Sequence, residues 1–108
     1  MKMYICFLVI ISKAVMRTFY TIHADAQIPL DDWYELTKNA NWKNFHEMKK
    51  TFNSVDAVGN DRYVFNIKGN AYRLIALIIF KVRTVFILFI GTHREYDRIN
   101  AARTVFKK

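Results

Sequence analysis

The stretch of sequence that decides the fold is RYVFNIKGNAYRLIALIIFKVRTVFILFIG, residues 62–91. Residues 62–68 alternate between polar and apolar side chains, which is the period of a β-strand with one buried face. Gly69 and Asn70 then predict a tight hairpin turn. Residues 72–80 and 84–90 are rich in β-branched and aromatic side chains and predict two further strands. Both of these strands are apolar on both faces, so we expect part of the sheet to remain exposed for a partner protein.

Helical patterns dominate the first half of the chain. Ser12 is suited to cap a helix over residues 12–21, and Asp25 to cap a second one with Pro29 in its first turn. Residues 44–50 suggest a further helical turn. At the other end of the chain, Thr92 and Glu95 form a capping-box pattern that predicts a last helix over roughly residues 93–105.

The N-terminus contains an unbroken apolar run, Met3–Ile11. Its β-branched and aromatic content favours a buried strand. A targeting segment is the alternative, but Lys13 interrupts the position where a cleavage site would follow. The run is also too short for a membrane-spanning helix, which needs roughly 20 residues.

These elements predict an α+β fold in the order β-α-α-β-β-β-α. The strands form an antiparallel sheet of about four strands, with helices packed mainly on one side. At 108 residues the chain is long enough for one domain, and we assign residues 1–108 to it.

Composition narrows the class of protein. The chain has 17 Lys and Arg residues and 9 Asp and Glu residues, for a net charge of +8. Residues 55–108 contain ten of these basic residues and four of the acidic ones, so their net charge is +6. This asymmetry suggests a polyanionic partner, with ordinary solubility charge as the alternative. A hydrophobic content of 53% excludes a disordered chain. The single cysteine, Cys6, excludes an internal disulfide framework and favours a reduced, cytoplasmic setting.

The hairpin brings polar side chains together. Turns of two or four residues both place Asn66 opposite Arg73, so Arg62, Asn66, Lys68 and Arg73 are expected to share one face of the sheet. A solvated outer face is the alternative interpretation. Arg73 argues for a function, because it is a lone cation within an apolar strand.

The next connection brings in a second group of residues. If residues 81–83 form a three-residue loop, Arg73 lies opposite Gly91, with His93 next on the same face; a loop of two or four residues would put Thr92 there instead. His93, Tyr96 and Asp97 follow at spacings that share one face of a helix. Such side chains can move protons near neutral pH.

No metal or cofactor is expected. The histidines His23, His46 and His93 are far apart in the sequence, and neither a metal-ligand spacing nor a phosphate-binding glycine loop is present. A metal-free group of Arg, Lys, His, Tyr and Asp suits RNA cleavage, because RNA carries its own nucleophile, the 2′-hydroxyl.

The same residues resemble a known family, the HigB toxins of type II toxin–antitoxin systems. The resemblance covers about residues 8 to 100. It rests on two long blocks, 52–75 and 89–97, and on shorter pieces at 11–13, 23–26, 33–34 and 40–43. Ala24 stands where a Pro is common. Family members begin near Leu8, so residues 1–7 are interpreted either as an N-terminal extension or as the result of a misassigned start.

The resemblance implies a RelE-like fold and cleavage of mRNA on translating ribosomes. It implies a HigA-like helix-turn-helix antitoxin as partner, with operator DNA bound only through that antitoxin and no membrane involved. Lys68 and Arg73 would contact or stabilise the scissile phosphate, and His93, Tyr96 and Asp97 would transfer protons or position the nucleotide. Further RNA contacts are expected from Arg62, Asn66, Arg94 and Arg98.

Two other functions stay open at this point. A non-catalytic RNA- or ribosome-binding protein of the same fold would use the basic face alone, without a titratable group at residues 93–97. A protein that binds anionic membranes through residues 1–17 is the weaker alternative, because Ser12 and Lys13 interrupt the apolar face.

Overall fold

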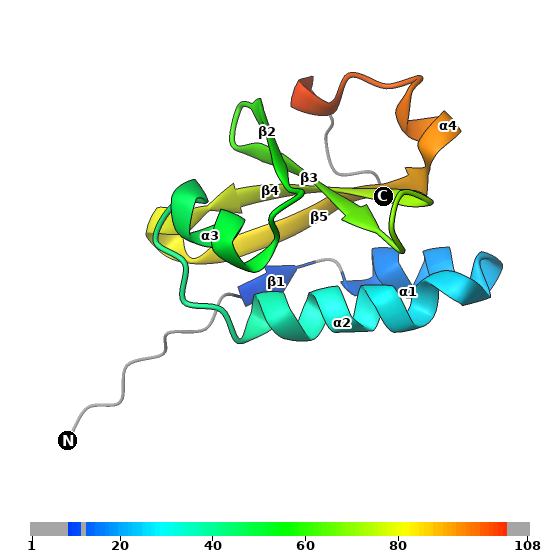
Figure 1. The fold of residues 1–108 in the computed structure, drawn as a ribbon, viewed down its shortest axis with the longest axis horizontal. Coiled ribbons are helices and arrows are strands. Elements are labelled where there is room, and N and C mark those ends of the chain that lie inside the picture. Colours follow the sequence, from blue (N-terminus) through cyan, green and yellow to red (C-terminus); the bar gives the residue numbers. More distant parts are fainter. Residues whose placement is uncertain (1–8, 12, 104–108) are drawn as a thin grey trace.

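The computed structural model describes residues 9–11 and 13–103. Its elements, in chain order, are β1 (Val9–Ile11), α1 (Lys13–Ile22), the 3-10 turn η1 (Ala24–Ala26), α2 (Gln27–Lys38), α3 (Phe45–Thr51), β2 (Asp56–Gly59), β3 (Arg62–Ile67), β4 (Tyr72–Ile79), η2 (Phe80–Val82), β5 (Thr84–Thr92), α4 (His93–Tyr96) and η3 (Ala101–Arg103). The strands form one sheet in the order β1-β5-β4-β3-β2, with α1 and α2 beneath it and α3 at one end (Figure 1).

The α+β class is confirmed, but the sheet differs from the prediction in two ways. It has five strands among the described residues, because residues 56–59, expected as loop or edge, pair with β3 as the edge strand β2. It is also mixed rather than antiparallel, because β1 runs parallel to β5 while the other pairs are antiparallel. Of the predicted N-terminal strand, Val9–Ile11 is confirmed, and the remainder lies outside the described residues.

The β3–β4 hairpin has the predicted register, with Asn66 opposite Arg73. Its turn is the four-residue alternative, Lys68–Ala71, closed by the Ala71 amide, which donates to the Lys68 carbonyl at 3.1 Å. Lys68 has a left-handed φ of 54° and Gly69 one of 62°. The chain therefore leaves the strand direction at Lys68, and the alternation of faces stops there.

This turn corrects one prediction about the basic face. Lys68 does not share a face with Asn66 and Arg73. Its ammonium group instead lies 2.7 Å from the carboxylate of Asp25, on the side that the helices cover. The physical reason is the left-handed backbone at Lys68, which period-2 counting ignores.

The β4–β5 connection reaches the predicted pairing by a different route. Arg73 lies opposite Gly91, yet Ile79 already pairs with Thr84, so the loop has four residues rather than three. A bulge between Ile75 and Ala76 shifts the register by one residue and restores the pairing. Without this shift, a four-residue loop would place Arg73 opposite Ile90, with Thr92 next on the same face, and that arrangement does not occur.

Helices α1, α2 and α3 cover one face of the sheet. The buried apolar side chains that they contribute are Met16, Leu30, Trp33 and Met48. These pack against alternate residues of the strands, among them Phe65, Leu74, Ile78 and Ile87. The helical and strand periods predicted from the sequence thus meet in one core. None of the described helices is long and apolar enough to cross a membrane.

Two of the predicted helix caps need comment. Asp25 does not cap a helix, because α2 begins at Gln27 and its N-cap position is Ala26, which offers no capping side chain. The predicted cap Ser12 lies outside the described residues. The cap of α3 is Asn44, whose side-chain oxygen accepts from the Glu47 amide at 2.9 Å.

The C-terminal segment covers the other face of the sheet. The capping box at Thr92 and Glu95 is confirmed. Of the helix predicted over 93–105, residues 93–103 form one helical turn, α4, followed by an irregular stretch and η3, and the remainder lies outside the described residues. There the chain turns back over the sheet, and the side-chain amide of Asn60 donates through Nδ2 to the Ala102 carbonyl at 2.8 Å. Ala101 packs into a second core cluster with Val64, Ile75 and Leu88. Packing on this face outweighs the helical pattern, and it covers part of the surface expected to remain exposed.

Gly91→Ala should destabilise the fold. A methyl group at Gly91 would clash with the Phe89 ring and lie 2.9 Å from Glu95 Oε1, the atom that accepts from the Thr92 amide in the capping box. We expect the free energy of unfolding to fall by about 1–3 kcal/mol, as for other overpacked sites. Urea denaturation measures the change.

The matched control is Gly69→Asn. Gly69 has nothing within 4 Å of an added Cβ, and asparagine adopts left-handed backbone angles more readily than most residues. We expect a change within about 0.5 kcal/mol. Equal losses in the two variants would show that crowding at Gly91 is not the cause.

Candidate functional site

Polar and titratable side chains gather at one end of the sheet, where the β3–β4 turn meets the start of α4. The amide of His93 donates to the carbonyl of Ala71 at 3.3 Å and ties the two segments together. Tyr72 and Arg73 follow this turn and, as successive strand residues, point to opposite faces. They lead into two clusters: the inner cluster, on the helix-covered face, is His23, Asp25, Lys68 and Tyr72, and the outer cluster is Asn66, Arg73, His93, Tyr96 and Asp97.

Arg73 is the half-buried centre of the outer cluster. Its Nη1 donates to the carbonyl oxygens of Asn70 at 3.1 Å and Tyr72 at 3.5 Å. Its guanidinium carbon lies 5.8 Å from the centroid of the Tyr96 ring, within cation–π range. Among residues 9–11 and 13–103, no carboxylate pairs with this cation. The guanidinium is therefore held in place while its charge remains available to an anion.

His93 and Asp97 form a pair one helical turn apart, as their spacing predicts. His93 Nδ1 lies 3.2 Å from Asp97 Oδ2, and both side chains are about half exposed. An Nδ1–H that donates to the carboxylate leaves Nε2 of a neutral imidazole as a proton acceptor. No group of three or more metal-ligating side chains forms in the part of the chain that the structure describes.

The inner cluster is built around the carboxylate of Asp25. Lys68 Nζ donates to Oδ2 at 2.7 Å, and the Tyr72 hydroxyl donates to Oδ1 at 2.5 Å. The Tyr72 ring is buried, at 8% exposure. Its centroid lies 5.2 Å from that of Phe19 and 5.4 Å from that of His23, and the Phe19 and His23 rings stack at 4.4 Å.

The charges in the inner cluster follow from these contacts. Hydrogen bonds from Lys68 and then Tyr72 lower the pKa of the Asp25 carboxyl below 3.8, so it is ionised at neutral pH. The same carboxylate, together with burial, raises the pKa of the Tyr72 hydroxyl above 10.0, so Tyr72 is neutral there. The cluster thus contains one ion pair and one neutral hydroxyl donor.

Sequence reasoning missed this cluster. Asp25 lies 43 residues from Lys68 and 47 from Tyr72 along the chain, and no local pattern connects them. The local pattern predicts a helix cap at Asp25 and leaves His23 as an isolated histidine. The one signal present was the block 23–26, which belongs to the family resemblance.

The remaining predicted RNA-binding residues divide into two groups. Arg94 and Arg98 are exposed on and just after α4, beside the outer cluster. Arg62 lies at the other end of β3, opposite Leu77, and its Nη1 donates to the Asn60 carbonyl at 2.8 Å. Four residues of strand, roughly 13 Å, separate it from Asn66, so the structure does not bring Arg62 into the site.

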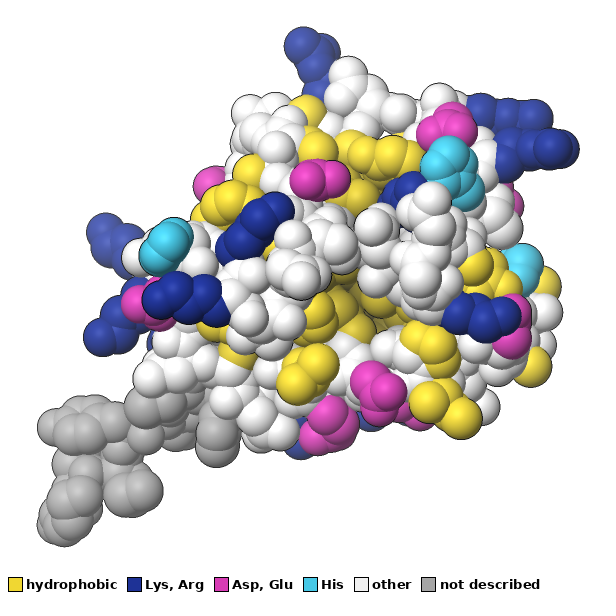
Figure 2. Space-filling model, in the orientation of Figure 1, with side chains coloured by type: hydrophobic (Ala, Val, Ile, Leu, Met, Phe, Trp, Pro, Cys, Tyr) yellow, Lys and Arg dark blue, Asp and Glu magenta, His cyan; other side chains and the backbone are white. Residues whose placement is uncertain are grey.

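The distribution of charge agrees with this location. Figure 2 shows Lys and Arg side chains in two regions: beside a histidine at the upper right, where Figure 1 places α4, and at the left, where Figure 1 places α3. Carboxylates lie instead along the lower edge, over α2. A polyanion would be attracted to the basic regions, one of which adjoins the outer cluster, and repelled by the lower edge.

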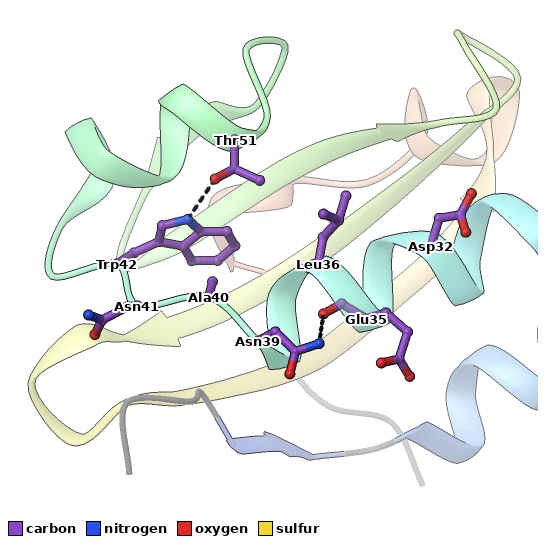
Figure 3. Close-up of a pocket in the computed structure, with 8 residues that line it drawn as sticks. All are labelled: Asp32, Glu35, Leu36, Asn39, Ala40, Asn41, Trp42 and Thr51. Carbon is purple, nitrogen blue, oxygen red and sulfur yellow. Dashed lines mark hydrogen bonds between the residues drawn. The ribbon is translucent and has the colours of Figure 1, made fainter. Parts of the chain in front are cut away.

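A pocket lies between α2 and α3, away from both clusters (Figure 3). Its lining residues are Asp32, Glu35, Leu36, Asn39, Ala40, Asn41, Trp42 and Thr51. Trp42 and Thr51 form one wall of the pocket, where Trp42 Nε1 donates a hydrogen bond to Thr51 Oγ1 at 3.0 Å. None of the predicted site residues lines this pocket, and its two carboxylates make it unsuitable for RNA.

Comparison with known proteins identifies the family. The model of the HigB toxins, the RelE-like toxic component of a toxin–antitoxin system, matches residues 26–99. The mRNA interferase HigB of Escherichia coli O6:H1 (strain CFT073) is 30% identical over 92 residues, covering 83% of this chain and 89% of that protein. The mRNA interferase toxin HigB of Escherichia coli strain K12 and the mRNA interferase HigB of Shigella flexneri are each 36% identical over 70 residues, covering 62% of this chain and 67% of theirs. The family match spans well over half of the sequence, and the chain therefore belongs to the HigB family of RelE-like toxins.

Proposed function

We propose that this chain is an endoribonuclease that cleaves mRNA on translating ribosomes and so inhibits translation. The observation that carries the proposal is the outer cluster: Arg73, which is held against Tyr96 and pairs with no carboxylate of the described residues, at the end of the sheet where α4 carries the His93–Asp97 pair. A cation and a proton-transfer pair at one place are what phosphodiester cleavage requires. The names of the relatives, mRNA interferases, support the same reaction.

The proposed reaction uses the RNA's own 2′-hydroxyl as nucleophile. This oxygen loses its proton to a base and attacks the phosphorus, the bond to the 5′-oxygen breaks, and the 5′-oxygen takes a proton from an acid. The products carry a 2′,3′-cyclic phosphate and a 5′-hydroxyl. Arg73 and Lys68 stabilise the extra negative charge on phosphorus, and no metal takes part.

Proton transfer is assigned to residues of α4. His93 has Nε2 available when Nδ1 donates to Asp97, so His93 serves as base or acid and Asp97 orients it. Tyr96 lies against Arg73 and positions the guanidinium or the nucleotide. Asn66, Arg94 and Arg98 bind RNA around this centre.

The cellular partners proposed are those of the family. A HigA-like helix-turn-helix antitoxin neutralises the toxin, and operator DNA is bound through the antitoxin alone. The site of action is the cytoplasm, where translating ribosomes present the mRNA.

Arg73→Ala should abolish both growth inhibition and cleavage. Removing one charge-stabilising donor typically lowers the rate about 10²–10³-fold. The measurement is mapping of RNA 5′ ends after a pulse of expression, with thermal melting to verify the fold. Lys81→Ala is the matched control, because it removes the same charge from an exposed residue at the other end of β4, and it should remain active.

Two outcomes would contradict this assignment. A folded Arg73→Ala variant with full activity would mean that the outer cluster is not the active site. If the unaltered chain bound ribosomes but cleaved no RNA, the non-catalytic binding protein would be favoured instead.

His93→Gln should reduce the single-turnover rate of cleavage on programmed ribosomes by about 10²–10⁴-fold. Histidine side chains titrate near neutral pH and glutamine does not, so the variant should also lose a limb of the pH–rate profile. Ribosome binding should change little, because Lys68, Arg73, Arg94 and Arg98 still supply the positive field.

Tyr96→Phe and Asp97→Asn complete the series. Asp97→Asn should lower the rate less than His93→Gln, because it removes only the group that orients the imidazole. If His93→Gln left the rate and pH profile unchanged while the other two variants lost more activity, proton transfer would be assigned to Tyr96 or Asp97 instead.

A further inference from the structure

We propose that Asp25 is a positioning residue for cleavage, which acts by holding Lys68 at the edge of the β3–β4 turn. The inference rests on the proposed function and extends it to a residue outside the outer cluster. It follows from the inner cluster, where a single carboxylate receives both a buried tyrosine hydroxyl and the lysine ammonium.

Lys68 needs such a restraint. It lies in a turn, its backbone has left the strand, and its side chain is 48% exposed. A lysine in this position has four flexible bonds and no strand neighbour to hold it. The bond to Asp25 Oδ2 fixes the ammonium and still leaves two of its three N–H donors for a phosphate.

Asp25 is itself held in place. It lies in η1, the single 3-10 turn between α1 and α2, where the Ala26 amide donates to the His23 carbonyl at 2.9 Å. Its other carboxylate oxygen accepts from Tyr72, whose ring is buried against Phe19 and His23. The restraint therefore runs from the packed core through Tyr72 and Asp25 to the ammonium of Lys68.

A role in stability alone accounts less well for this arrangement. The Lys68–Asp25 pair is about half exposed on both sides, and exposed ion pairs contribute little to folding stability. A carboxylate beside an RNA-binding turn also weakens the attraction for RNA. Its presence there is explained if the order that it gives to Lys68 matters more than the charge that it removes.

The two effects have opposite signs, which makes the proposal testable. Asp25→Asn raises the net charge by one, which on charge alone should strengthen RNA binding. Loss of positioning should instead lower the maximal single-turnover rate by about tenfold to a hundredfold. Asp32→Asn makes the same change of charge on α2, away from both clusters, and should leave the rate unchanged.

The decisive experiment is a double-mutant cycle of Asp25→Asn and Lys68→Met. Cleavage on programmed ribosomes is measured for each single variant and for the double variant, at saturating and at half-saturating toxin. We expect each single change to lower the maximal rate, and the double variant to be no slower than Lys68→Met alone. Tyr72→Phe, which leaves the Lys68–Asp25 bond in place, should retain more activity than Asp25→Asn.

Several results would overturn the proposal. If the losses multiply in the double variant, Asp25 acts independently of Lys68. If Tyr72→Phe and Asp25→Asn lower activity and melting temperature equally, Asp25 only fastens the helices to the hairpin. If Arg73→Ala is inactive while Asp25→Asn cleaves normally, the positioning role alone is wrong; if Arg73→Ala is fully active too, the proposed function of the site fails as well.

Discussion

The structure depends on β4 being apolar on both of its faces. This strand lies in the middle of the sheet, paired with β3 on one side and β5 on the other, so both faces must be covered for the fold to be stable. Helices α1, α2 and α3 cover one face and residues 93–103 the other. The fold therefore has three layers: the helices, the sheet and the C-terminal segment. The two covering layers both end near the β3–β4 turn.

The same constraint determines where the polar residues can lie. Along β4 the positions of both faces are occupied by packing, and Ile75, Ala76 and Ile78 are almost fully buried. Only the first two residues of the strand, Tyr72 and Arg73, bear polar groups, and they lie where the covering layers end. Each layer supplies a partner: η1 offers Asp25 to Tyr72, and α4 offers Tyr96 to Arg73. Two clusters at one end of the sheet result from one strand that is polar only at its beginning.

Local patterns in the sequence predicted the features that depend on residues close together in the chain, namely the hairpin register and the start of α4. The alternation in residues 62–67 and the Gly69-Asn70 turn were enough for the register that places Asn66 opposite Arg73. The Thr92–Glu95 capping box was equally local, and it fixes the helix start that brings His93 within reach of Asp97.

What the sequence missed depends on residues far apart in the chain. Asp25 meets Lys68 and Tyr72 across more than 40 residues. The helix predicted over 93–105 is interrupted because Ala101 packs against the sheet, which a helical pattern cannot reveal. The bulge at Ile75 and Ala76 compensated for a wrong loop length, so the Arg73–Gly91 pairing was right for a reason other than the one expected.

The left-handed backbone at Lys68 has a consequence for the charges of the site. Had the strand continued, Lys68 would share a face with Arg73, and two cations would stand together beside Asn66. Instead Lys68 lies with Asp25 on the inner side of the turn, while Arg73 lies against Tyr96 on the outer side. On the proposed function, an RNA backbone that crosses the turn meets a fixed cation on each side of it. Asp25 holds one of these cations and Tyr96 contacts the other, so the placement of both cations, and not only the total positive charge, then determines how the scissile phosphate lies beside His93.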